Sequence, residues 1–313
     1  MSQDPGHIFK YYLLCMVAVI GGSSAVIFVR MATAPSMVLV VYRMFMAAIL
    51  LLPSAVSHRE EVLHADRKTK LVAAAAGAVL GLHFFTYFSS VKMTSVAASS
   101  ILVNLQVIFV AFLSGIIFKT RIRGLGWIAI FTALPGASII TLGSGNDGTG
   151  TLSGNMVALL SAVFLGSYFL LSTVCRRHLS TPSFTSITYP VSGLTMLIVA
   201  LATGTPLFGY GAVNYLMGLC LAVFPTLMGH SLYSYCLKYL PTPTVSTMQL
   251  MDAVFAVIWG LLFFDDRLTW VVVIGGILAI GGVIWFNLLQ SKSSAAEENA
   301  FAGDREYHKE EKT

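Results

Sequence analysis

Residues 91–122 read VKMTSVAASSILVNLQVIFVAFLSGIIFKTRI, and residues 237–268 read LKYLPTPTVSTMQLMDAVFAVIWGLLFFDDRL. The two stretches align without a gap, and each residue of the second lies 146 positions after its counterpart in the first. Self-similarity of this kind indicates that the chain contains two copies of one structural unit. The identical pairs include Lys92 with Lys238, Ser100 with Ser246, Phe109 with Phe255, Phe118 with Phe264, and Arg121 with Arg267.

Both copies consist mainly of apolar blocks. Of the 313 residues, 56% are hydrophobic and 11% are charged, whereas about a quarter of an ordinary soluble domain is charged. The blocks are about 20 residues long, the length that a helix needs to cross a bilayer. Helices satisfy their own backbone hydrogen bonds in lipid, and the alternating pattern of barrel strands is absent. We therefore predict an all-α integral membrane protein with ten transmembrane helices, at 11–29, 35–54, 71–90, 95–117, 125–143, 153–174, 184–203, 213–236, 243–264 and 268–289.

The basic residues predict the orientation of these helices. The formal net charge is +5, and 15 of the 19 lysines and arginines lie on one set of helix flanks. The positive-inside rule places those flanks, and with them both termini, in the cytoplasm of a multi-pass cell-membrane protein. The 55–70 loop has four basic residues, whereas its counterpart at 204–212 has none. Because the basic residues lie in short loops, membrane orientation explains them better than binding of nucleic acid.

An odd number of helices per copy makes the two copies insert with opposite polarity. We predict a first five-helix repeat at 11–143 and a second at 152–290, preceded by a cytoplasmic segment, 1–10, and followed by a disordered cytoplasmic tail, 291–313. Inverted repeats that enclose a site near the membrane midplane are how many solute carriers are built. The repeat and its reversed charge bias therefore predict a transporter.

Several other classes of site lack their sequence signals. Cys15, Cys175, Cys220 and Cys236 stand singly in or beside apolar blocks, without the spacing of a metal site or a disulfide framework. The sequence contains no Walker loop and no HExxH motif. We predict no metal and no cofactor, and ATP is not expected as a direct energy source.

Four further stretches resemble a known family. They are GGSSAVIFVRMATAPSMVLVVYRMFMAAILLL in the first helix pair, GNMVALLSAVFLGSYFLLSTVCRRHLS at the start of the second half, PTLMGHSLYSYCLKYLPTPTVSTMQLMDAVFAVIWGLLFFDDRLT with its Gly229-His230 motif, and IGGILAIGGVIWF in the tenth helix. Over residues 10–290 the chain resembles the EamA-type transporters of the drug/metabolite transporter superfamily.

The resemblance implies a carrier of small metabolites or drug-like solutes, amino-acid-like ones among them, often moving them outward. It also implies a central cavity lined by helices 1, 3, 4, 6, 8 and 9. Two positions depart from the family pattern. Asp252-Ala253 stands where relatives often have Glu-Pro, and Lys119-Thr120 stands where helix 4 usually ends in an acidic residue. The coupling ions that relatives use are therefore a poor guide to the coupling ion of this chain.

Asp252 is the only acidic residue well inside a predicted span. A charged group at the centre of a spanning helix costs about 2.5–3.5 kcal/mol on insertion scales. Its repeat partner is Gln106, and Gln249, Asp252, Ala256 and Gly260 form one narrow face of a helix. We predict that Asp252 and Gln106, with Gln249, bind substrate near the midplane, where Asp252 holds a cationic group or takes a coupling proton. A structural hydrogen bond or ion pair between helices is the alternative.

Histidines and tyrosines of helices 3 and 8 complete the candidate substrate site. His230 and Tyr233 lie on helix 8, while His83 and Tyr87 lie on helix 3, and the two tyrosines are repeat partners. A buried histidine can act as a protonation switch, and the alternative is a neutral histidine that hydrogen-bonds between helices. Arg43 is the other intramembrane charge, and a structural role is favoured for it because helix 2 is not an expected cavity wall.

We therefore predict a secondary transporter that works by alternating access, with a small solute, membrane lipid and protons as its partners. Within transport, a proton-coupled carrier and a passive facilitator both fit the sequence, and a homodimer is compatible with it. An intramembrane enzyme that uses Asp252 and His230 as an acid/base pair is the alternative from another class.

Overall fold

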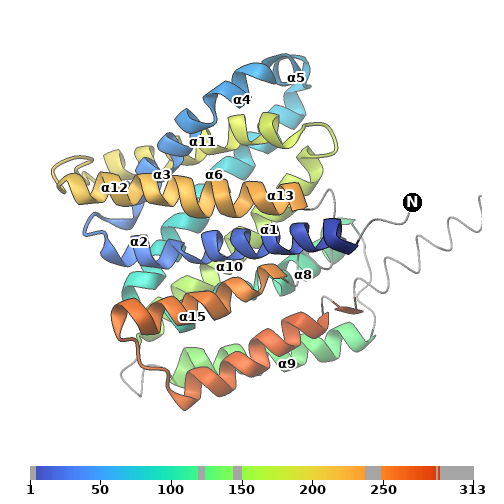
Figure 1. The fold of residues 1–313 in the computed structure, drawn as a ribbon, viewed down its shortest axis with the longest axis vertical. Coiled ribbons are helices and arrows are strands. Elements are labelled where there is room, and N and C mark those ends of the chain that lie inside the picture. Colours follow the sequence, from blue (N-terminus) through green and yellow to red (C-terminus); the bar gives the residue numbers. More distant parts are fainter. Residues whose placement is uncertain (1–4, 119–123, 144–149, 237–247, 287, 290–313) are drawn as a thin grey trace, which may run out of the picture.

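A computed structural model describes residues 5–118, 124–143, 150–236, 248–286 and 288–289, and the regular secondary structure of these residues is helical throughout. The predicted disordered tail at 291–313 lies outside these residues. Figure 1 shows the helices crossing the molecule side by side.

The described helices lie in both halves of the chain. In the first half they are α1 (Pro5–Ser23), α2 (Ala25–Met31), α3 (Ser36–Leu50), α4 (Leu52–Ser57), α5 (Arg59–His64), α6 (Arg67–Met93), α7 (Val96–Asn104), α8 (Gln106–Phe118) and α9 (Gly124–Gly143). In the second half they are α10 (Leu152–Cys175), α11 (Thr181–Ala202), α12 (Ala212–Leu221), the π-helical segment η1 (Ala222–Ser231), α13 (Leu232–Cys236), α15 (Met251–Phe264) and a last helix, Trp270–Phe286.

Six helices are long and apolar enough to cross a membrane: Phe9–Met31, Arg67–Met93, Leu125–Gly143, Leu152–Cys175, Thr181–Ala202 and Ala212–Gly229. Four shorter apolar helices lie within the remaining predicted blocks: Ser36–Leu50, Val96–Val110, Met251–Phe264 and Trp270–Phe286. The all-helical membrane class predicted from the sequence is therefore confirmed for the described residues.

Small polar side chains fix where four of the helices begin. Asp66, Ser95, Thr151 and Ser180 each accept a hydrogen bond from the backbone N–H three residues later, at the start of α6, α7, α10 and α11. Such caps satisfy backbone donors that the first turn of a helix leaves without partners. The polar residues between apolar blocks thus set the helix boundaries.

The prolines inside the apolar blocks behave differently from one another. α9 and α11 continue as α-helices through Pro135 and Pro190. At Pro225 the helix widens into η1, where the Thr226 hydroxyl donates to the carbonyl of Leu221, five residues earlier. Because proline has no N–H, it removes an α-helical hydrogen bond, and a π-helical segment is one way to absorb that loss.

The two halves of the chain interlock. α6 packs against α10 and α11, while α1 packs against η1, α13 and α15. α6 comes into close contact with α11 at Gly77 and Gly81, because a Cβ at Gly77 would lie 2.6 Å from the carbonyl oxygen of Thr188 on α11. Small residues let membrane helices approach at backbone distance.

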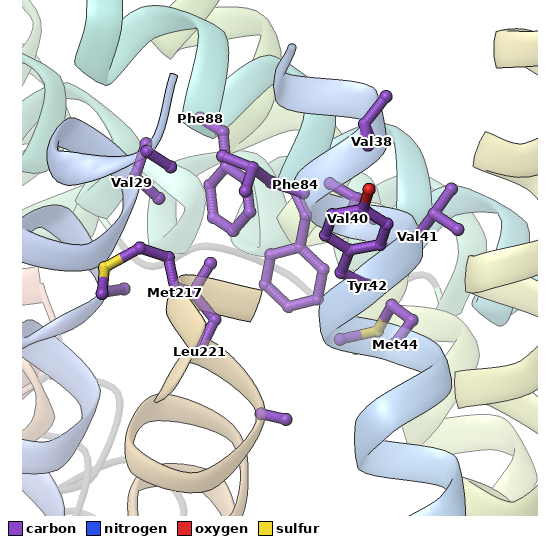
Figure 2. Close-up of a cluster of buried hydrophobic side chains, with 14 of the residues drawn as sticks. Val29, Val38, Val40, Val41, Tyr42, Met44, Phe84, Phe88, Met217 and Leu221 are labelled. Atoms are coloured by element: carbon purple, nitrogen blue, oxygen red, sulfur yellow. The ribbon is translucent and has the colours of Figure 1, made fainter. Parts of the chain in front are cut away.

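A buried apolar cluster holds α2, α3, α6 and α12 together. Figure 2 shows Phe84 and Phe88 of α6 between the side chains of α3 and those of α2 and α12. Val29, Val38 and Phe88 are fully buried in it. The cluster lies next to Arg43, so it forms part of the support for the site described below.

α9 and the last helix form a pair whose contacts are reciprocal. A Cβ at Gly136 would lie 2.5 Å from the amide nitrogen of Ala279, and a Cβ at Gly282 would lie 2.7 Å from that of Ala133. Gly136 and Gly282 are 146 positions apart, as are Ala133 and Ala279. The same contact is therefore made twice with the roles of the two halves exchanged.

This pair predicts that Gly282→Ala destabilises the folded protein, because the new methyl group would meet two backbone atoms that cannot move aside. Overpacking of this kind costs about 1–3 kcal/mol. Gly281→Ala is the matched control, since a Cβ at Gly281 has nothing within 4 Å. Thermal unfolding in detergent measures both variants. Equal melting temperatures for the two would contradict the close contact.

Candidate functional site

One cavity of about 1530 Å³ runs into the centre of the bundle between the two halves. It is lined mainly by apolar and aromatic side chains. Six of the seven residues predicted to bind substrate contribute to its wall: His83, Tyr87, Gln106, Tyr233, Gln249 and Asp252. For the seventh, His230, the backbone lies in η1, and the side chain lies outside the described part of the structure.

Asp252 stands in the first turn of α15, facing α1 and α13. The Tyr233 hydroxyl donates a hydrogen bond to Asp252 Oδ1 at 2.9 Å. α1 comes so close that a Cβ at Gly22 would lie 3.1 Å from Oδ2. No lysine or arginine among the described residues forms an ion pair with this carboxylate. Asp252 is thus a charge-bearing group inside an apolar bundle, held by a tyrosine hydroxyl.

The helix face predicted to carry Asp252 is only partly a cavity wall. Gln249, Asp252 and Ala256 line the cavity. Gly260, about two turns after Asp252, instead lets α15 approach α7, because a Cβ at Gly260 would lie 3.2 Å from Val96 Cβ. The polar part of the stripe faces the cavity, and its small-residue end serves packing.

The other intramembrane charge, Arg43, also lines the cavity. Its side chain is only 2% exposed. Nε donates to Thr226 Oγ1 at 3.0 Å, and the guanidinium carbon lies 3.8 Å from the centre of the Phe84 ring. α3 corresponds to the predicted second spanning helix, at 35–54. Its residues line the cavity, whereas this helix was expected to lie outside the cavity wall. That expectation came from the family resemblance and not from the residues themselves.

His83 joins two helices at the cavity wall. Its Nδ1 lies 2.9 Å from Ser161 Oγ and 3.1 Å from the carbonyl oxygen of Ser161 on α10. Its ring stacks on Tyr87, with the two planes 6° apart. This geometry matches the helix-to-helix hydrogen bond that the sequence offered as the alternative to a protonation switch.

Both helices that carry the predicted midplane pair are irregular beside it. Between α7 and α8, the amide of Ile108 bonds to the carbonyl of Leu105, and before α15, the amide of Ala253 bonds to the carbonyl of Leu250. These bonds span three residues, as in a 3₁₀ turn, which often marks a functional hinge in a long helix. Gln106 and Asp252 thus each lie inside such a turn, although the two turns are one position apart at the repeat offset. Gln106 Oε1 is buried without a described hydrogen-bond partner.

A group of polar contacts lies beyond the cavity, at the end of the bundle that holds the α2–α3 and α6–α7 connections. We call this group the Arg30 clamp, and it consists of Arg30, Val91, Thr94, Val96 and Asp266. Arg30 Nη1 lies 2.6 Å from Asp266 Oδ1, and the other guanidinium nitrogens donate to the carbonyls of Val91 and Thr94. Asp266 Oδ2 accepts from the amide of Val96. The clamp joins α2 and α7 of the first half to the end of α15.

A second contact lies between the clamp and the cavity. The indole nitrogen of Trp259 on α15 donates to Ser23 Oγ on α1 at 3.0 Å. Ser23 and Ala256 are cavity-lining residues, whereas Arg30 and Asp266 are not. The cavity therefore ends before this side of the bundle.

At the opposite end, the cavity wall reaches residues of the α3–α4 and α10–α11 connections. Arg176 and Arg177 line it and are exposed. Beside this mouth, Glu61 of α5 accepts hydrogen bonds from the Ser180 amide and from the Ser180 and Ser183 hydroxyls. These bonds from Ser180, then Ser183, lower the pKa of the Glu61 carboxyl, because they favour its ionised form.

Comparison with known proteins agrees with this architecture. The sequence profile of the EamA-like transporter family matches residues 9–142 and again residues 152–288. The chain belongs to the EamA-like transporter family. The match covers both halves separately, in keeping with the two copies found in the sequence.

Among similar proteins, the uncharacterized transporter YdfC of Bacillus subtilis (strain 168) is 23% identical over 72% of this chain and 74% of its own. An uncharacterized transporter of Clostridium kluyveri is 26% identical over 62% of this chain and 64% of its own. A solved crystal structure matches with a TM-score of 0.62 at 16% identity, over 90% of this chain and 97% of the other. The last likeness concerns the fold alone.

Two features, one in the cavity wall and one beyond it, were missed by sequence reasoning. Tyr189, a buried cavity-lining residue, is the repeat partner of Arg43, so the offset of 146 applied to Arg43 would have found it. The Arg30 clamp joins residues 236 positions apart, and no local pattern announces that contact.

Glu61 gives a prediction about pH. Because its pKa is lowered in the folded protein, its contribution to stability is present above the unfolded pKa, ordinarily about 4.3, and is lost as the pH falls through the folded value. Wild type should therefore be more stable than Glu61→Gln at pH 7, and the gap should narrow as the pH falls below about 4. Melting temperatures across this range test it, with the exposed neighbour substitution Glu60→Gln as control. A gap that stays constant with pH would rule out the carboxylate as its source.

Proposed function

We propose that this chain is a secondary transporter that moves a small metabolite across the cell membrane by alternating access, with Asp252 at its central site. The observation that carries the proposal is the cavity itself. It holds Asp252 near the bundle centre, reaches solvent-exposed residues at one end, and stops short of the Arg30 clamp at the other. This is the arrangement expected of a carrier that is open to one side.

Ten spans in two inverted five-helix repeats are part of this proposal. Four short apolar helices supplement the six long ones, and the α9 pairing with the last helix is reciprocal at the repeat offset. Other contacts exchange in the same way, because α6 packs against α10 and α11 much as α12 and η1 pack against α3 and α1. A two-fold axis between oppositely inserted halves produces such an exchange.

In this scheme, the mouth near Arg176 and Arg177 faces the cytoplasm, as do both termini, and the Arg30 clamp faces outward. A solute with a cationic group, an amino-acid-like one among the candidates, enters from the cytoplasm, and Asp252 binds that group or exchanges a proton for it. Opening of the clamp while the mouth closes then releases the solute outside. Export, proton coupling and a cell-membrane location all belong to the proposal.

Asp252→Asn should lower solute release at least about tenfold while insertion into the membrane stays normal, because it removes the negative charge and keeps the shape. Loss of a charged hydrogen-bonding partner costs about 1.5–3 kcal/mol, which corresponds to that factor or more. Untargeted profiling of the medium around cells with and without the protein identifies the solutes, and uptake into liposomes at imposed pH gradients then tests coupling.

Asp265→Asn is the matched control for this substitution. It makes the same chemical change at an exposed position beyond the end of α15, outside the cavity wall. Wild-type flux with wild-type pH dependence in Asp252→Asn would remove Asp252 from the mechanism.

Arg30→Gln should open the outer end of the cavity, on the side of the Arg30 clamp. The ion pair is only partly exposed, at 22% for Arg30 and 13% for Asp266, so its loss leaves a carboxylate without its partner. In a chain whose four native cysteines are replaced, the thiol introduced by Ala256→Cys should react several-fold faster with an impermeant reagent added outside once Arg30 is changed. Arg59→Gln, which breaks an exposed ion pair, serves as control. Identical reactivity in both backgrounds would show that the clamp is no gate.

A further inference from the structure

Arg43 is a cation buried at the cavity wall without a balancing carboxylate. Its side chain is 2% exposed, and no aspartate or glutamate among the described residues forms an ion pair with it. An ion removed from water without a counter-charge is strongly destabilising for a fold. A stack on Phe84 at 3.8 Å and one neutral hydroxyl partner compensate only part of that cost.

The guanidinium has hydrogen-bonding capacity left for a ligand. An arginine presents five N–H donors in a rigid fork, and the described structure accounts for one of them, Nε with Thr226 Oγ1. The two Nη nitrogens are the ends of the fork that match a carboxylate in a bidentate pair. Thr226 and Phe84 hold the fork from η1 and from α6, which fixes its orientation.

The surroundings of Arg43 differ from those of Asp252. Arg43 lies among α3, η1 and α6, whereas Asp252 lies among α1, α13 and α15. Both line the same cavity without forming an ion pair, and Tyr87 and Tyr189 contribute aromatic side chains to its wall. The cavity thus has two separate subsites, one with the Asp252 carboxyl group and one with the Arg43 guanidinium.

We propose that Arg43 is the binding residue for a carboxylate group of the transported solute, with the carbon body of the solute against the aromatic wall. A single guanidinium balances one negative charge, so an organic monocarboxylate suits this subsite better than a phosphate dianion. The assignment rests on the proposed transport function, and it replaces the structural role that the sequence favoured for Arg43.

Binding of benzoate and of benzamide tests this subsite on the full chain in nanodiscs. The two probes have the same shape, but only benzoate carries a negative charge. Benzoate should raise the melting temperature of wild type in a concentration-dependent way, and benzamide should not. Arg43→Gln should abolish the benzoate response. Arg43→Lys, which keeps the charge but loses the fork, should shift the half-maximal benzoate concentration at least tenfold upward.

Two control variants separate binding from structure. Thr226→Val removes the hydroxyl that orients the Arg43 fork but keeps the cation, so it should weaken the benzoate response without abolishing it. Arg176→Gln removes an exposed arginine at the mouth and should respond like wild type. If Arg43→Gln does not fold, Arg43→Lys carries the comparison.

Equal stabilisation of wild type by both probes, no benzoate response at all, or an unchanged response in the Arg43 variants would each overturn the carboxylate assignment. Because binding is measured without transport, such a failure leaves the proposed function standing. Failure of Asp252→Asn to alter flux would remove the central role of Asp252 in transport, whatever benzoate does.

Discussion

Asp252 and Arg43 share one cavity, and neither has an ion-pair partner among the described residues. A charged side chain at the centre of a membrane span costs about 2.5–3.5 kcal/mol on insertion scales, so such residues are expected to have a function. The fold meets this cost with neutral partners. Tyr233 donates to Asp252, while Thr226 and Phe84 hold Arg43.

Those partners depend on irregular backbone. Thr226 follows Pro225 in the π-helical segment, and Asp252 lies inside the 3₁₀ turn that starts at Leu250. Gly22 completes the arrangement, because any larger residue there would press on the Asp252 carboxylate. Irregular helices and small residues therefore lie where the polar groups need them, and the regular apolar helices around them supply the frame, including the cluster of Figure 2.

The sequence predicted the helical class and the candidate residues, six of which line one cavity, because hydrophobic block length and the repeat offset are global signals. The family was predicted separately, from the resemblance of four stretches to known transporters. Asp252, Gln106 and Tyr87 were found by asking which polar residues interrupt the blocks and which of them pair at an offset of 146. Arg43 was predicted to be an intramembrane charge, but its position in the cavity wall was not predicted, because the tilt and packing of a helix depend on long-range contacts.

The Arg30 clamp is a second feature that depends on long-range contacts and could not be predicted from the sequence. Arg30 and Asp266 look like ordinary helix-flanking charges in the sequence, and only their 2.6 Å contact across the bundle reveals a shared role. The breaks inside the apolar blocks at Ser24 and Leu105 were not predicted either. No proline marks these two positions, so composition alone carries no signal for them.

Two oppositely inserted halves are the central claim, and the side of the membrane on which their equivalent loops lie tests it most directly. Leu63 in the 55–70 loop is 65% exposed and Phe208 in the 204–212 loop is 71% exposed, so cysteines placed there would be accessible. In a chain without its four native cysteines, the account predicts that an impermeant maleimide labels Phe208→Cys from outside intact cells and labels Leu63→Cys only after the membrane is opened. Labelling of both from the same side would contradict it.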